Sequence, residues 1–117
     1  MNTKTDLIGA RLCGLDKEYE VTAALECVSL ITLKDGEPHE WLRDFSISNK
    51  ADRMDVVEAL GEKHGIAIVP TGSTSLPWCA TNDGEIGIGG GDNASHEEAT
   101  RAALESLADI YLKEGGA

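Results

Sequence analysis

The stretch from Asp83 to Tyr111 constrains the fold of this 117-residue chain more than any other, because it contains a turn, a strand and a helix in succession. Asn82-Asp83-Gly84 is a hairpin turn signal, and the strand Glu85 to Ile88 follows it. Ser95 and the glutamate three residues later form a capping box, which predicts a helix that runs to Gly115. A sheet with a helix laid on it is therefore expected.

A glycine run, Gly89-Gly90-Gly91, separates this strand from this helix, which is where dinucleotide-binding loops carry their glycines. Asp92 occupies the place of the third glycine of that fingerprint. Together with Glu97 and Glu98 it would repel a phosphate group from the helix N-terminus. The sequence predicts no cofactor, and the glycines are interpreted as a flexible connection between strand and helix.

The first 15 residues are predicted to form an N-terminal helical extension of a single domain that spans residues 1–117. Thr3 and Asp6 have the spacing of a capping box, and Gly14 provides a stop. Residues 18–33 fit two patterns. A helix is favoured, because a strand of this length would be unusual, but the alternation of Tyr19, Val21 and further apolar residues also fits a strand.

The centre of the chain is predicted to contain an extended segment and a helix. Trp41 and Phe45 alternate on one side of residues 40–47 and are expected to cover the edge of the core, with ligand stacking as the alternative role of Trp41. Ser48 or Asn49 caps the middle helix, whose buried side is assigned to Met54, Val56, Val57 and Leu60.

Two more short strands complete the prediction. Ile66 to Val69 is apolar and bounded by Gly65 and Pro70, and Leu76 to Ala80 precedes the hairpin turn. The fold class that follows is α/β, with a small, mainly antiparallel sheet and helices packed around it in an αβα sandwich.

Charge is the compositional feature that bears on function. The chain has 21 acidic and 10 basic residues, a net charge of −11. This excludes direct binding to a nucleic acid backbone and favours a protein partner with a basic surface, although an acidic surface can also serve solubility alone. The predicted partner-binding residues are the acidic residues on helix faces: Asp52, Asp55, Glu58, Glu97, Glu98, Glu105 and Asp109.

Three cysteines without a C-x-x-C pair and three scattered histidines predict neither disulfides nor a metal site. The chain contains no apolar run of membrane-spanning length, and we expect a cytoplasmic protein without catalytic residues. The competing interpretation is a small enzyme or ligand-binding module built around Trp78, Cys79 and His64.

Several short motifs resemble the phage ABA sandwich domain family across nearly the whole chain. They are Asp6-Leu7-Ile8, Gly14-Leu15-Asp16-Lys17-Glu18, Asp44-Phe45-Ser46, Val56-Val57-Glu58-Ala59-Leu60, Trp78 on a strand, and Ala99-Thr100-Arg101-Ala102-Ala103-Leu104. The resemblance implies helices around a small sheet and a phage or prophage origin, and it carries no catalytic residues.

The function expected from these observations is that of a small acidic phage accessory protein that binds another protein. The specific hypothesis is an inhibitor of a host defence complex, of the anti-CRISPR or anti-restriction type, whose carboxylates mimic nucleic acid. A structural or virion-associated phage protein that self-associates through apolar surface is the alternative.

Overall fold

The computed structural model describes the backbone of residues 3–23, 27–72, 74–82, 85–93 and 95–116. The elements follow one another as α1 (Thr3–Leu12), a short 3-10 helix η1 (Leu15–Lys17), β1 (Tyr19–Ala23), β2 (Val28–Lys34), β3 (Glu37–Phe45), α2 (Lys50–His64), β4 (Ile66–Pro70), β5 (Trp78–Asn82), β6 (Glu85–Asn93), α3 (His96–Glu105) and α4 (Ala108–Gly116).

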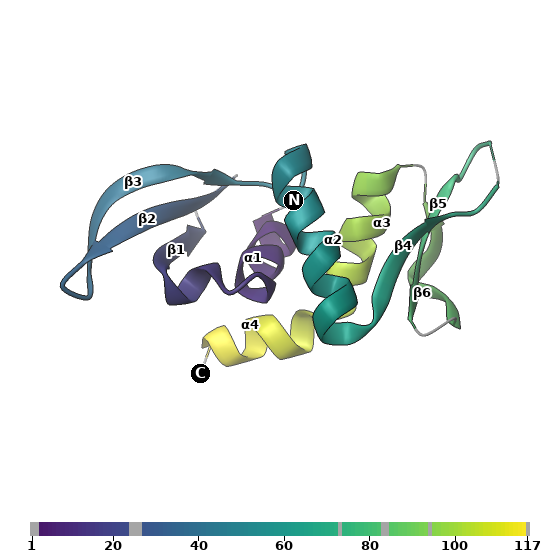
Figure 1. Cartoon of the computed structure of the whole chain (residues 1–117). Coiled ribbons are helices and arrows are strands. Elements are labelled where there is room, and N and C mark those ends of the chain that lie inside the picture. The colour runs from purple at the N-terminus through teal and green to yellow at the C-terminus, as the bar shows by residue number, and fades with distance from the viewer. Residues whose placement is uncertain (1–2, 24–26, 73, 83–84, 94, 117) are drawn as a thin grey trace.

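The molecule is elongated, with dimensions of 49 × 23 × 21 Å, and its helices lie between two small sheets (Figure 1). Strands β1-β2-β3 form one antiparallel sheet and β4-β5-β6 form the other. The predicted α/β fold, a small, mainly antiparallel sheet with helices packed around it, is confirmed, and the strands form two such sheets at opposite ends of the helical layer.

The core lies where the helices meet the near ends of the two sheets. Helix α1 contributes Ile8 and Leu12, α2 contributes Leu60 and α3 contributes Leu104, and all four side chains are fully buried. Phe45, the last residue of β3, is buried among them. Burial of such side chains stabilises the fold by about 1.5 to 3 kcal/mol each.

The predicted helix ends are confirmed for α2 and for the start of α3. Asn49 caps α2, because its side chain accepts a hydrogen bond from the backbone N–H of Asp52. Gly65 ends α2 in the left-handed conformation, with φ of 67°. Ser95 caps α3 in the same way as Asn49, by accepting from the N–H of Glu98.

The preferred helix over residues 18–33 is wrong, because this region forms strands β1 and β2. Tyr19 and Val21 of β1 are half-buried, while Glu20 and Thr22, each of which follows one of them, are exposed. This alternation with a period of two residues places one face of the strand on the core. The strand alternative was therefore the correct reading, with the chain turning back between β1 and β2 instead of continuing as one long strand.

The glycine run is also a correction, since it belongs to strand β6 and is not a separate connection. Cys79 of β5 pairs with Asp92, and the next residue, Ala80, pairs with Ile88. The three glycines between these partners form a bulge. Glycine suits a bulge because its backbone adopts conformations that other residues disfavour.

The long C-terminal helix predicted from Ser95 to Gly115 is broken into α3 and α4. The break falls at Ser106, whose hydroxyl donates to the carbonyl of Ala103 and so competes with the helical hydrogen-bond pattern. After the break, α4 lies along α1, where the guanidinium of Arg11 donates to the carbonyl of Tyr111. The change of direction therefore lets the C-terminal residues cover α1 (Figure 1).

A buried ion pair joins the first and last parts of the core. Arg101 Nη1 lies 3.0 Å from Asp6 Oδ1, and the same oxygen accepts from the backbone N–H of Ile47 at 2.9 Å. Arg101 also donates to Glu97 and to the hydroxyl of Ser48. The predicted capping role of Asp6 is wrong, because its carboxylate points into this network.

Helix α1 passes close to its neighbours at Gly9, which yields a stability prediction. A Cβ at this position would lie 2.9 Å from Ile47 Cδ1 and 3.2 Å from Val56 Cγ2. Overpacking of this kind costs about 1 to 3 kcal/mol, which outweighs the gain of about 1 kcal/mol in helix propensity. We therefore expect Gly9→Ala to lower the free energy of unfolding in a urea titration.

The matched control is Gly61→Ala in α2. A Cβ at Gly61 has Ile66 O, at 3.8 Å, as its nearest neighbour, which is an ordinary contact. Here the propensity gain acts alone, and an increase of about 0.5 to 1 kcal/mol is expected. An equal change in the free energy of unfolding for Gly9→Ala and Gly61→Ala would contradict the close approach at Gly9.

His96, the first residue of α3, generates a pH prediction. Burial, and next the charge of Arg53, lower the pKa of His96. Its Nδ1 accepts a hydrogen bond from Arg53 Nε at 3.1 Å, and its ring meets Trp78 edge-on. Protonation would place a second N–H opposite the donor, so the neutral ring is the form that fits.

The unfolded state binds a proton at His96 more readily than the folded state, because the pKa of His96 is about 6.5 when unfolded and lower when folded. The contribution of His96 to stability is therefore fully present above pH 6.5. It is lost as the pH falls through the folded pKa. We expect the free energy of unfolding to fall from pH 7 to pH 5, and His96→Gln to reduce that slope. His39→Gln, on the exposed part of β3, is the control and should keep the wild-type slope. Identical slopes in the two variants would refute the role of His96.

Candidate protein-interaction surface

The sheet β1-β2-β3 extends beyond the helices (Figure 1). Exposed apolar side chains lie on its outer face. Ile31 of β2 lies opposite Trp41 of β3, so both side chains project from the same face. Trp41 is 62% exposed, Leu33 is 38% exposed, and Ile31 is half-buried. We call the face that Ile31, Leu33 and Trp41 share the outer apolar face.

Sequence reasoning placed Trp41 on the edge of the core beside Phe45, and this prediction is wrong. Leu30 pairs with Arg43, but the next residue, Ile31, pairs with Trp41, so Leu42 is an extra residue in β3. This bulge reverses the alternation, because a shift of one residue moves a side chain to the other face. Trp41 therefore projects outward although Phe45 projects inward.

Hydrogen bonds fix the orientation of the exposed indole. Trp41 Nε1 donates to Asp44 Oδ1 at 3.2 Å, and Ser29 Oγ donates to the same oxygen at 3.0 Å. An exposed tryptophan that is already held in place loses less conformational entropy when a partner covers it. Tryptophan is also among the residues that most often dominate binding energy at protein interfaces.

Carboxylates surround the outer apolar face. Glu20 lies directly opposite Ile31 in the register, and Asp35, Glu37, Glu40 and Asp44 are exposed on the β2–β3 hairpin. Two basic residues belong to the same hairpin. Lys34 is exposed, whereas Arg43 is committed to an ion pair with Asp52 at 2.9 Å. The surroundings of the face are therefore acidic, and they favour a basic partner surface.

The predicted acidic contact residues differ in their availability. Asp52 is not on the outer side of α2, because its side chain is 4% exposed and accepts from Arg43 and from the backbone N–H of Ser46. Met54, expected to be buried, is exposed instead. Glu97 is tied to Arg101 and Ser48, and Glu105 pairs with Lys4 at 2.8 Å. The exposed remainder is Asp55, Glu58, Glu98 and Asp109.

The electrostatics of Glu97 show how firmly it is held. Burial acts to raise its pKa, but hydrogen bonds from Ser48 and Arg101 and the charges of Arg101 and Arg53 outweigh burial, and the pKa is lowered. Its carboxylate is thus part of the network that joins α3 to the loop before α2. An outside partner would have to compete with these contacts.

The residues of the alternative enzyme hypothesis contact different neighbours. His64 Nε2 lies 2.7 Å from the hydroxyl of Tyr111, whereas Trp78 packs against His96. Cys79 is 5% exposed. In the part of the chain that the structure describes, no group of three His, Cys, Asp or Glu side chains could hold a metal ion.

Comparisons with known proteins give no relatives for this chain. No family model matches the sequence, no curated protein matches it, and no solved structure matches the fold. Among the described residues, no helix has the length and apolar character needed to cross a membrane. The outer apolar face and the acidic surface are therefore interpreted from their geometry alone.

Cys13, at the end of α1, yields a prediction about thiol reactivity. Burial, and next the charge of Asp55, raise its pKa to about 11, although Lys63 acts in the opposite direction. Since the thiolate is the nucleophile, Cys13 should react with iodoacetamide at neutral pH at least about tenfold more slowly than an unstructured cysteine.

The measurement uses a variant with Cys27→Ser and Cys79→Ser, so that Cys13 is the remaining thiol. The same variant in denaturing urea is the control, because unfolding removes both burial and the neighbouring carboxylate. A native rate equal to the denatured rate would show that Cys13 is not shielded.

Proposed function

We propose that this protein acts by binding another protein through the outer apolar face. The observation that supports the proposal is Trp41, an indole that is 62% exposed and yet held by Asp44. Isolated exposed apolar residues are common on protein surfaces. Trp41 differs from such isolated residues, because it is held in place, has apolar neighbours and is surrounded by acidic residues. These features are typical of the centre of a protein interface and its polar rim.

The acidic surround supports a proposal about the charge of the partner. With a net charge of −11 and five exposed carboxylates around the face, a basic protein surface is the complementary choice. We propose that the partner is a host defence nucleoprotein whose nucleic-acid channel is basic, and that this chain is a phage accessory inhibitor of the anti-CRISPR or anti-restriction type. Its site of action would then be the host cytoplasm.

Self-association as a virion or structural component is the second candidate. The outer apolar face supports it, since a second copy could cover the same residues. The charge opposes it, because two identical faces would bring Glu20, Glu37 and Asp44 of one copy toward those of the other. Light scattering at high protein concentration distinguishes the two, since a monomer is expected for the inhibitor.

The central prediction concerns Trp41→Ala. We expect this variant to lose the ability to block DNA binding by a purified, guide-loaded host nuclease or restriction complex. A loss of at least about 2 kcal/mol, roughly 30-fold in affinity, is expected for an anchor residue. The free energy of unfolding should change by less than about 0.5 kcal/mol, because the side chain is exposed.

Leu76→Ala is the matched apolar control, because Leu76 is also exposed but lies between β4 and β5 at the other end of the molecule. It should leave inhibition unchanged. The electrostatic component is tested by added salt and by charge reversal at Glu37 and Glu40, two exposed carboxylates on β3. If neither weakens binding, the nucleic-acid mimicry is refuted, and equal effects of Trp41→Ala and Leu76→Ala would refute the outer apolar face.

A further inference from the structure

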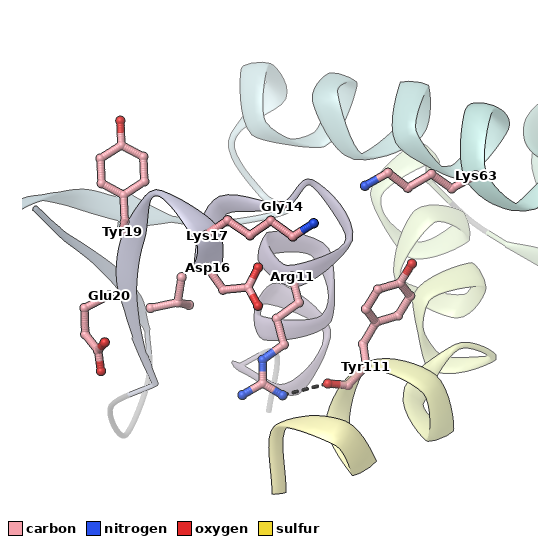
Figure 2. Close-up of a pocket in the computed structure, with 9 residues that line it drawn as sticks. Arg11, Gly14, Asp16, Lys17, Tyr19, Glu20, Lys63 and Tyr111 are labelled. Carbon is pink, nitrogen blue, oxygen red and sulfur yellow. Dashed lines mark hydrogen bonds between the residues drawn. The ribbon is translucent and has the colours of Figure 1, made fainter. Parts of the chain in front are cut away.

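A groove of about 460 Å³ is lined by residues of α1, η1, β1, α2 and α4 (Figure 2). Its volume falls in the range of small-molecule sites, about 300 to 1,000 Å³. The lining residues are Arg11, Gly14, Asp16, Lys17, Tyr19, Glu20, Val21, Lys63 and Tyr111. Most of them are polar or charged, so the groove suits a polar ligand.

The groove concentrates positive charge in an acidic protein. Three of the ten basic residues of the chain line it, namely Arg11 from α1, Lys17 from η1 and Lys63 from α2. Arg11 and Lys17 are close in the sequence, whereas Lys63 reaches the same groove only through the fold. In Figure 2 the side chains of Lys17 and Lys63 extend toward each other from opposite sides.

Two of the three cations are held in place by backbone carbonyls. Arg11 Nη1 donates to the carbonyl of Tyr111 at 2.7 Å, and Lys63 Nζ donates to the carbonyl of Leu12 at the end of α1. A guanidinium has five N–H donors, and the contact with Tyr111 uses one nitrogen. Arg11 is therefore oriented, and donors remain for an oxyanion.

Lys17 differs from the other two cations in its contacts. Its side chain is exposed and makes neither a hydrogen bond nor an ion pair with any residue that the structure describes. It is thus available to a ligand without loss of a contact within the fold. Lysine in this role supplies a point charge, while arginine supplies directional hydrogen bonds.

The groove also has acceptors for hydroxyl groups. Figure 2 shows the Asp16 carboxylate between Lys17 and Arg11, whereas the side chain of Glu20 is directed away from the three cations. The Tyr111 ring stands between Arg11 and Lys63, and its hydroxyl lies 2.7 Å from His64 Nε2. A carboxylate beside three cations suits a ligand that has an anionic group and hydroxyl donors together.

We propose that this groove binds a small organic phosphate that carries hydroxyl groups, with Lys17 and Lys63 at the phosphate, Arg11 as a further cation at the α4 end of the groove, and Asp16 accepting from a hydroxyl. Two lysine cations match a phosphate dianion better than the single charge of a carboxylate. The proposed ligand contacts Arg11, Asp16, Lys17 and Lys63 are not among the residues that define the outer apolar face, Ile31, Leu33 and Trp41.

The test is an amide NMR titration of the full chain with glycerol phosphate, glycerate and glycerol as probes. Glycerol phosphate should give saturable chemical-shift changes of the amides of Gly14, Lys17, Tyr19 and Tyr111. The dissociation constant should be below about 10 mM, which is weak binding. Glycerate should bind at least about fivefold more weakly, because it offers one negative charge. Glycerol, without charge, should give no saturable shift.

Lys17→Glu should weaken the binding of glycerol phosphate by about tenfold, since it replaces an attractive charge with a repulsive one. The matched control is Lys50→Glu, the same change of charge on an exposed lysine at the opposite end of α2 from Lys63. It should change the affinity by less than about twofold, because surface charges beyond a Debye length are screened. Both lysines are exposed, so both variants should fold.

Three results would overturn the proposal. One is the absence of saturable shifts with glycerol phosphate, and another is glycerate binding as tightly as glycerol phosphate. The third is equal weakening by Lys17→Glu and Lys50→Glu, which would mean that net charge alone governs the response.

Discussion

The ion pair between Asp6 and Arg101 is the contact on which the arrangement of the helices depends. It joins α1 to α3, and the same carboxylate oxygen accepts from the backbone of Ile47, in the loop between β3 and α2. A buried charge costs several kcal/mol unless its partner and its hydrogen bonds are present. The three segments can therefore pack only in the arrangement that completes this set, and the ion pair specifies geometry more than it adds stability.

The loop from Ser46 to Asn49 is held by a second set of charges. Arg53 donates to the carbonyl of Ile47, and Asp52 accepts from the N–H of Ser46 while pairing with Arg43 of β3. The base of the β2–β3 hairpin is thus fixed to the first turn of α2. This connection fixes the orientation of the β1-β2-β3 sheet relative to α2, although the sheet makes few contacts with the helices. Trp41 is therefore held at a defined position on the surface.

Local signals predicted the elements that local chemistry determines. The caps Asn49 and Ser95 and the left-handed Gly65 follow from single residues and their immediate neighbours, and so does the hairpin of β5 and β6. The helix prediction for residues 18–33 was wrong because the apolar residues there fit both the helical period of about 3.6 residues and the strand period of two. The pairing of these strands with each other and with β3 selects the strand. The direction that α4 takes after the break at Ser106 is not a local feature, since α4 packs against α1.

The candidate site was only partly accessible to sequence reasoning for the same reason. The exposed position of Trp41 depends on one extra residue, Leu42, and this bulge contains no glycine that could have marked it in the sequence. Asp52 looked like a surface carboxylate because nothing nearby in the sequence shows that Arg43 reaches it. The cations of the groove come from three elements, so their convergence follows only from the fold. Exposed acidic residues such as Glu98 and Asp109 were predicted correctly, since an outward helix face is a periodic feature.

The two irregularities of β3 have a consequence for the behaviour of the protein in a crowded cell. This strand is the last of its sheet, nine residues long and exposed along almost its whole length, which is the kind of edge that recruits further strands into fibrils. Register shifts on either side of Ile31 interrupt its hydrogen-bonding row, and Pro38 lacks an N–H to offer. An apolar surface can thus be displayed to a partner by side chains, while the backbone beside it is unsuited to polymerisation.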